Sequence, residues 1–79
     1  MTPISICVIA KNEEKNIRTF LSSIQKSMGK YPYEIVLVDT GSTDCTREIA
    51  REFNVRLFSF KWINDFSAAR NFSISKASY

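Results

Sequence analysis

Three short polar clusters carry residue types that recognise nucleotides and anions. They are residues 10–14 (Ala-Lys-Asn-Glu-Glu), 39–44 (Asp-Thr-Gly-Ser-Thr-Asp) and 64–71 (Asn-Asp-Phe-Ser-Ala-Ala-Arg-Asn). A carboxylate such as Asp39 can accept hydrogen bonds from a ribose hydroxyl or from a base N–H group. The cations Lys11 and Arg70 suit a diphosphate, and the planar guanidinium of Arg70 suits bidentate contact with it.

Each of these residues also has a purely structural interpretation. Asp39 can cap the turn that follows it, and Gly41 allows a positive φ in that turn. Residues 42–44 are typical caps of a following helix, and the acidic pair at positions 13–14 is favoured at a helix start by the helix dipole. The functional interpretation therefore depends on whether the three clusters lie at one edge of the fold.

The clusters follow three segments whose patterns predict β-strands. Residues 4–10 and 34–39 are nearly continuous apolar runs, typical of strands buried on both faces of a parallel sheet. Residues 55–60 alternate in part and predict a shorter strand nearer an edge. Parallel strands end at the same edge of their sheet, and ligands bind there. We therefore expect the three clusters to form one site.

Helical patterns separate these strands. One stripe of apolar residues has the spacing of a single helical face: Ile17, Phe20, Leu21, Ile24 and Met28. We expect Asn12 to cap this helix and Gly29 to end it. Further helices are expected over residues 46–53 and 65–78. The alternation predicts an α/β fold, a Rossmann-like βαβαβα half-domain with a parallel sheet in the order 3-2-1.

The composition fits one small globular domain. The chain has 79 residues and a net charge of +3, and its basic residues are scattered, so we expect no nucleic-acid partner. No apolar run approaches the roughly 20 residues of a membrane span, and no signal pattern is present. We expect a cytoplasmic location. If the chain is part of a longer protein, the alternative is the cytoplasmic surface of the inner membrane. Histidine is absent, and the two cysteines lack metal-ligand or redox spacing.

Two classes of nucleotide-binding protein are excluded by the first cluster. A dinucleotide-binding fold or a P-loop needs a glycine-rich phosphate loop directly after the first strand. This chain has Lys-Asn-Glu-Glu there, and its two carboxylates repel phosphate. A nicotinamide-dependent enzyme is therefore not expected.

Together the clusters resemble the N-terminal part of an inverting glycosyltransferase of family 2, which has the GT-A fold. The similar segments are residues 6–14, 35–46 and 62–71, and they span essentially the whole chain. The resemblance implies that residues 1–79 are the nucleotide-binding half of such a domain. The third segment is similar to a bacterial subgroup that includes lipopolysaccharide-core and peptide glycosyltransferases, which implies polysaccharide, lipopolysaccharide or protein glycosylation.

The resemblance also implies roles for particular residues. These are Ala10, Lys11, Asn12 and Glu13 in one wall of the nucleotide pocket, Asp39 at the base, and Arg70 at the base or the diphosphate. The implied donor is a nucleotide sugar, expected to be a UDP-sugar, and the implied acceptor is a glycan, lipid or peptide. Lys11 departs from many relatives, in which an aromatic residue at this position stacks on the base.

The chemical steps of the family depend on residues that are not in this sequence. In the family, the next strand leads into an Asp-x-Asp motif that binds Mg²⁺ or Mn²⁺, and a later Asp or Glu is the general base. We expect both in a full-length enzyme, with ligands outside this chain. The 79 residues alone are therefore expected to be inactive.

Two alternatives use the same order of elements. One is a stand-alone, non-catalytic α/β binding or interaction module. In it, the outer edge of the strand at residues 4–10 pairs with a partner or with a second copy of the chain. The other is a phospho-acceptor regulatory domain, which needs an Asp at the end of the third strand. Residues 59–61 (Ser-Phe-Lys) offer none.

Overall fold

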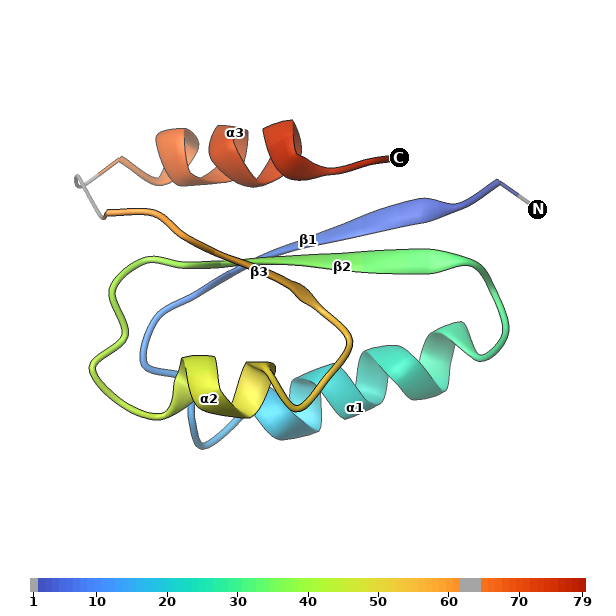
Figure 1. Cartoon of the computed structure of the whole chain (residues 1–79), viewed down its shortest axis with the longest axis horizontal. Helices are drawn as coiled ribbons and strands as arrows, with labels where there is room; N and C mark the ends of the chain where they lie inside the picture. Colours follow the sequence, from blue (N-terminus) through green and yellow to red (C-terminus); the bar gives the residue numbers. More distant parts are fainter. Residues whose placement is uncertain (1, 62–64) are drawn as a thin grey trace.

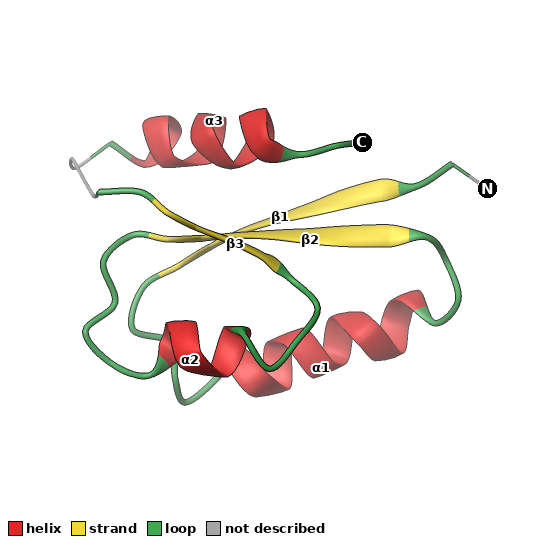
Figure 2. Cartoon of the chain, in the orientation of Figure 1, coloured by secondary structure: helices red, strands yellow, loops and turns green. Residues whose placement is uncertain are grey.

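The computed structural model describes residues 2–61 and 65–79 as a three-stranded parallel sheet with helices on both faces (Figure 1). The strands β1 (Ile4–Ala10), β2 (Tyr33–Asp39) and β3 (Arg56–Ser59) lie in the order β1-β2-β3. Helices α1 (Ile17–Met28) and α2 (Thr46–Ala50) cover one face, and α3 (Phe66–Lys76) covers the other (Figure 2). The predicted element order and the strand order 3-2-1 are therefore confirmed.

The central strand β2 runs through the core of the molecule. Every residue from 35 to 40 is buried, because β1 and β3 flank this strand and helices cover both of its faces. Leu37 faces α1 and joins Ile17 and Leu21 in one buried apolar cluster. Burying each such side chain is worth about 1.5–3 kcal/mol. The continuous apolar pattern at this position thus predicted both the strand and its burial correctly.

Strand β1 is less buried than its sequence predicts. Ile4 keeps 40% of its surface exposed, and Cys7 is also exposed. Within the residues that the structure describes, β1 pairs with β2 alone, so its second edge is open. A strand at a sheet edge receives less cover from neighbouring elements, which explains the wrong prediction of burial on both faces.

Helix α1 begins later than predicted, at Ile17, and Asn12 does not cap it. Asn12 has a φ of 53°, in the left-handed region, and its backbone N–H donates to Ser42 Oγ at 2.9 Å. The N–H of Glu13 donates to Thr46 Oγ1 at 2.8 Å. These contacts with a distant segment replace the local capping bonds that the sequence pattern suggests, and they delay the start of the helix.

The remaining boundaries are close to the predicted ones. Gly29 ends α1 as expected, with a φ of 55° and its N–H donating to Gln25 O at 3.1 Å. α3 starts after Asp65, whose carboxylate accepts from Ala68 N at 3.2 Å. Each of α2, β3 and α3 is shorter by a few residues than predicted. The sequence also predicts a loop over residues 62–65, and residues 62–64 of it lie outside the described part of the chain.

The segment after α3 is tied to the end of the sheet where the strands begin. Glu34 of β2 accepts hydrogen bonds from Ser5 Oγ and Ser78 N, both at 2.5 Å, and pairs with Arg56 at 3.0 Å. Arg56 also donates to Lys76 O at 2.7 Å. The bonds from Ser5 and Ser78 hold the pKa of Glu34 down at about 2. One carboxylate thus links all three strands to the C-terminal segment.

No helix among the described residues combines the length and the apolar character needed to cross a lipid bilayer.

Candidate functional site

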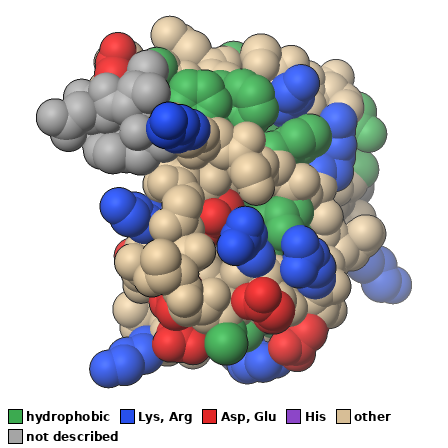
Figure 3. All heavy atoms as spheres, turned by 60° about the vertical axis from the view of Figure 1, so that its left-hand side comes forward, with side chains coloured by type: hydrophobic (Ala, Val, Ile, Leu, Met, Phe, Trp, Pro, Cys, Tyr) green, Lys and Arg blue, Asp and Glu red, His purple; other side chains and the backbone are tan. Residues whose placement is uncertain are grey.

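The polar clusters follow the carboxyl ends of the three parallel strands, which lie together at one end of the sheet, on the left in Figure 1. The strand ends are joined by the backbone: Thr40 N donates to Ala10 O at 3.0 Å, and Phe60 N donates to Asp39 O at 2.9 Å. Figure 3 turns this end toward the viewer, and Lys and Arg side chains lie there beside Asp and Glu side chains. We call this end of the sheet the carboxyl edge.

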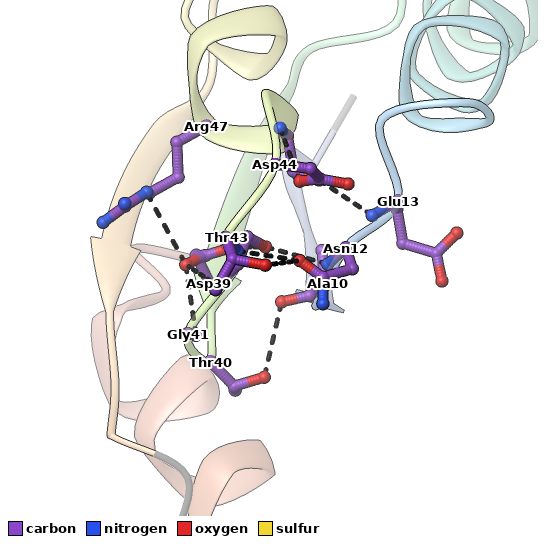
Figure 4. A network of polar contacts seen from close by, with 11 residues as sticks. Ala10, Asn12, Glu13, Asp39, Thr40, Gly41, Thr43, Asp44 and Arg47 are labelled. Carbon is purple, nitrogen blue, oxygen red and sulfur yellow. Dashed lines mark hydrogen bonds and ion pairs between the residues drawn. The ribbon is translucent and has the colours of Figure 1, made fainter.

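At the carboxyl edge, the loop after β1 is hydrogen-bonded to the loop after β2 (Figure 4). Asn12 N donates to Ser42 Oγ at 2.9 Å, and Asn12 Oδ1 accepts from Thr43 N at 2.8 Å. Glu13 N donates to Thr46 Oγ1 at 2.8 Å. Side chains of one loop thus satisfy backbone groups of the other, so the two loops form a single connected wall.

Asp44 stabilises the same wall through hydrogen bonds to both loops. Its Oδ1 accepts from Thr46 N at 2.9 Å and from Thr46 Oγ1 at 2.5 Å, and its Oδ2 accepts from Glu14 N at 3.2 Å. Burial by itself raises the pKa of Asp44, but the hydrogen bonds from Thr46 and Glu14 outweigh burial and lower it. Asp44 is therefore a carboxylate at neutral pH, committed to holding the loops.

Asp39 is the buried centre of the network. Its side chain is 1% exposed, and its Oδ2 accepts from Gly41 N at 3.2 Å and from Ser42 N at 3.0 Å. Its Oδ1 accepts from Ser42 Oγ, and Arg47 Nε of α2 lies 3.8 Å from Oδ2. These are the contacts that the turn-capping interpretation of Asp39 requires. A ligand can therefore bind only to the lone pairs of the Asp39 carboxylate that these hydrogen bonds do not occupy.

Two backbone positions at the carboxyl edge have positive φ. Gly41 has a φ of 113°, a conformation that a side chain disfavours even though a Cβ atom there would meet nothing within 4 Å. Asn12 has a φ of 53°, and asparagine is one of the few residues that adopt this region readily. Both residues are exposed, so the edge presents backbone as well as side chains to a ligand.

The structure unites some of the predicted site residues and separates others. Ala10, Asn12, Glu13 and Asp39 belong to the network, and Lys11 is exposed beside it. Arg70 lies on α3, the helix that covers the opposite face of the sheet from α1 and α2. It lines a cavity of about 270 Å³ together with Cys7, Ile9, Ser73 and Ile74. Among the described residues, no hydrogen bond joins Arg70 to the network.

A second cavity, of about 250 Å³, lies between β1 and α1, directly beside the predicted nucleotide wall. Ala10 and Glu13 belong to its lining, and the rest of the lining is mostly apolar: Val8, Ile9, Asn16, Ile17 and Phe20. The carboxyl edge is therefore flanked by one cavity on each face of β1.

Sequence reasoning missed three participants in this network. Ser42 was expected as a helix cap and Thr46 as a residue of the helix that follows, but the hydroxyls of both accept hydrogen bonds from the backbone of the other loop. Arg47 was not singled out at all. The available signal was the density of hydroxyl side chains between residues 40 and 46, four in seven positions, which is more than one helix cap requires.

Cys45 and the acidic side chains around it are the thiol and carboxyl groups to consider for chemistry at this edge. The charge of Glu14, burial and the charge of Glu48 raise the pKa of the Cys45 thiol, so it stays protonated at neutral pH. Within residues 2–61 and 65–79, no three His, Cys, Asp or Glu side chains lie close enough together to hold a metal ion.

Comparison with known proteins gives a consistent picture. The family model described as Glycosyl transferase family 2 matches residues 5–79. The chain is 36% identical over 77 residues to a TPR repeat-containing protein of Synechococcus elongatus, covering 98% of this chain and 18% of that protein. It is 40% identical over 73 residues to the glycosyltransferase SunS of Bacillus subtilis, covering 89% of this chain and 16% of SunS.

Similarity extends to an archaeal protein and to a solved structure. Glycosyltransferase AglE of Haloferax volcanii is 38% identical over 52 residues, covering 65% of this chain and 17% of AglE. The crystal structure of S. aureus TarS 1–349 superposes with a TM-score of 0.78 at 27% identity, covering 98% of this chain and 25% of that one. The chain thus spans less than a fifth of the length of these curated relatives.

Proposed function

This chain belongs to glycosyl transferase family 2, as its three motifs predict, and we propose that its carboxyl edge binds the nucleotide part of a sugar donor. The proposed reaction transfers a sugar, with inversion, from a nucleotide sugar to a glycan, lipid or peptide acceptor. The observation that best supports this proposal is the single wall made by the loops after β1 and β2. This wall lies where parallel α/β sheets bind ligands. Family membership favours an enzyme over a stand-alone interaction module.

In this proposal Asp39 reads the base. A carboxylate offers about four acceptor positions, and Gly41 N, Ser42 N and Ser42 Oγ occupy three of them. About one position remains for an N–H group of the base. That position is on Oδ1, because Oδ2 already accepts from two N–H groups. Arg47 Nε lies 3.8 Å from Oδ2 and its side chain is 41% exposed, so in this proposal its guanidinium contacts the ligand beside Asp39.

The wall made by residues 10–13 orients the donor beside Asp39. Lys11 and Arg70 are proposed to contact the diphosphate, because both are exposed cations: Lys11 directly follows β1, and Arg70 lines a cavity with Ile9 near the end of β1. Arg70 belongs to the opposite face of the sheet, so a donor that touches both Asp39 and Arg70 has to lie across the carboxyl edge. The base then rests on the α2 side and the diphosphate on the α3 side.

The finer details of this proposal follow the resemblance in the sequence. We propose a UDP-sugar donor, a bacterial glycosylation pathway and a cytoplasmic site of action. Residues 1–79 are proposed to form the nucleotide-binding part of a larger catalytic domain. The family implies Mg²⁺ or Mn²⁺, but the described residues hold no ligand set that fits either ion. We propose that these 79 residues alone do not transfer sugar.

Nucleotide binding by the naturally expressed protein tests the proposal. Calorimetric titration with UDP, GDP, CDP and ADP is expected to give binding of one nucleotide, which Asp39→Asn weakens about tenfold, as loss of a hydrogen bond to a charged group predicts. The matched control is Glu52→Gln, because Glu52 forms an exposed ion pair with Arg18 on the helical face. Failure of the wild type to bind any of the four nucleotides would disprove the proposal.

A further inference from the structure

We propose that Ser42 is a positioning residue that couples Asp39 to the loop after β1, and that nucleotide affinity depends on its hydroxyl group. This inference rests on the proposed function of the carboxyl edge. It assigns a role in ligand binding to a side chain that the sequence pattern marks only as a helix cap.

The contacts of Ser42 support this role. Ser42 is 5% exposed, and its hydroxyl donates to Asp39 Oδ1 and accepts from Asn12 N at 2.9 Å. A serine hydroxyl has a single proton, and here that proton is committed to Asp39. Its lone pairs must therefore face Asn12, so one buried oxygen fixes the position of the carboxylate relative to the neighbouring loop.

The conformation of Asn12 makes this bond important. Asparagine adopts a φ of 53° more readily than most residues, but this conformation still costs more than the usual backbone regions, so contacts that hold Asn12 there fix the course of the loop. Ser42 holds the backbone N–H of Asn12, and Thr43 N holds its side-chain oxygen at 2.8 Å. Without the Ser42 hydroxyl, one of these two restraints is lost, and the wall at residues 10–13 is free to shift relative to Asp39.

The loops remain attached by other bonds when Ser42 changes. Glu13 N still donates to Thr46 Oγ1 at 2.8 Å, and Glu14 N still donates to Asp44 Oδ2 at 3.2 Å. The backbone N–H of Ser42 also keeps its bond to Asp39. A Ser42→Ala protein is therefore expected to fold, with its binding wall less well aligned.

The experiment compares nucleotide affinity in variants of the naturally expressed protein, by calorimetric titration with UDP, GDP, CDP and ADP. Ser42→Ala is expected to raise the Kd of the bound nucleotide about tenfold, the usual effect of losing a hydrogen bond to a charged group. Ser42→Thr keeps the hydroxyl and is expected to stay within about threefold of the wild type. The matched control is Ser23→Ala, because the Ser23 hydroxyl donates only to Thr19 O on exposed α1.

A double-variant cycle tests whether Ser42 acts through Asp39. If it does, adding Ser42→Ala to Asp39→Asn should change Kd by less than about twofold, because coupled residues are not additive. The inference is overturned if Ser42→Ala binds as the wild type does, if Ser42→Thr is as weak as Ser42→Ala, or if the two substitutions are additive. Failure of the wild type to bind any nucleotide overturns the proposed function as well, which distinguishes the two failures.

Discussion

The contact between Thr46 and the loop after β1 gives the sharpest prediction for stability. The Thr46 side chain is fully buried, and its hydroxyl accepts from Glu13 N at 2.8 Å and donates to Asp44 Oδ1 at 2.5 Å. Thr46→Val removes this oxygen and leaves the shape of the side chain nearly unchanged. The substitution therefore isolates the two hydrogen bonds from packing.

The expected cost follows from the partners that are left behind. A buried polar group without a partner costs about 1–3 kcal/mol. Glu13 is an exposed residue whose hydrogen bond to Thr46 is only partly buried, while Asp44 keeps the bond from Thr46 N at 2.9 Å. For both reasons, the combined cost of the two lost hydrogen bonds should lie near the lower end of the range for two such groups. Thr46→Val is therefore expected to lower the free energy of unfolding by about 1.5–2.5 kcal/mol.

Urea denaturation followed by circular dichroism measures this change. The matched control is Thr43→Val, because Thr43 is exposed and its hydroxyl makes one long contact, 3.4 Å, to Asn12 Oδ1. The control is expected to lose less than about 0.5 kcal/mol, as most surface substitutions do. Equal losses for the two variants would refute the reasoning that buried hydroxyls bind the two loops together.

Three further predictions concern the rest of the fold. Because the pKa of Glu34 is held at about 2, its carboxylate stabilises the fold fully above a pH of about 4.5, and this contribution is lost as the pH falls toward 2. In an acid titration, the free energy of unfolding of Glu34→Gln should therefore fall less steeply with pH than that of the wild type. Gly41→Ala, at φ 113°, should cost about 1–3 kcal/mol in urea denaturation; an unchanged midpoint contradicts the assigned strain. Leu21→Ala should cost about 2–5 kcal/mol, more than the exposed Phe20→Ala.

The parts of the fold that depend on repeating patterns were predictable from the sequence. The helical stripe of α1 repeats burial at every third to fourth residue, and the continuous apolar run at β2 reflects burial on both faces of the sheet. The position of Gly29 at the end of α1 follows from its freedom to adopt a positive φ. Such signals lie within a single element and need no knowledge of distant neighbours.

The start of α1 and the role of Ser42 were not predictable, because both depend on contacts between distant segments. The sequence around Asn12 satisfies the rules for a helix cap. In the folded chain, however, residues 42–46 lie next to it, and their hydroxyls accept the backbone N–H groups of Asn12 and Glu13. For the same reason the sequence left two roles open for Asp39. The structure adds the bonds from Gly41 and Ser42, which show how much of this carboxylate is already engaged.

The hydrogen bonds between Glu34 and the C-terminal segment affect the order in which the molecule unfolds. Residues 77–79 follow α3 directly, so this helix is anchored at its C-terminal end by a carboxylate that loses its charge in acid. As the pH falls from about 4.5 toward 2, the protection of amides against hydrogen exchange should therefore be lost first in α3, while the amides of β2 stay protected. In acid, α3, which carries Arg70, is therefore expected to detach from the sheet before the strands separate.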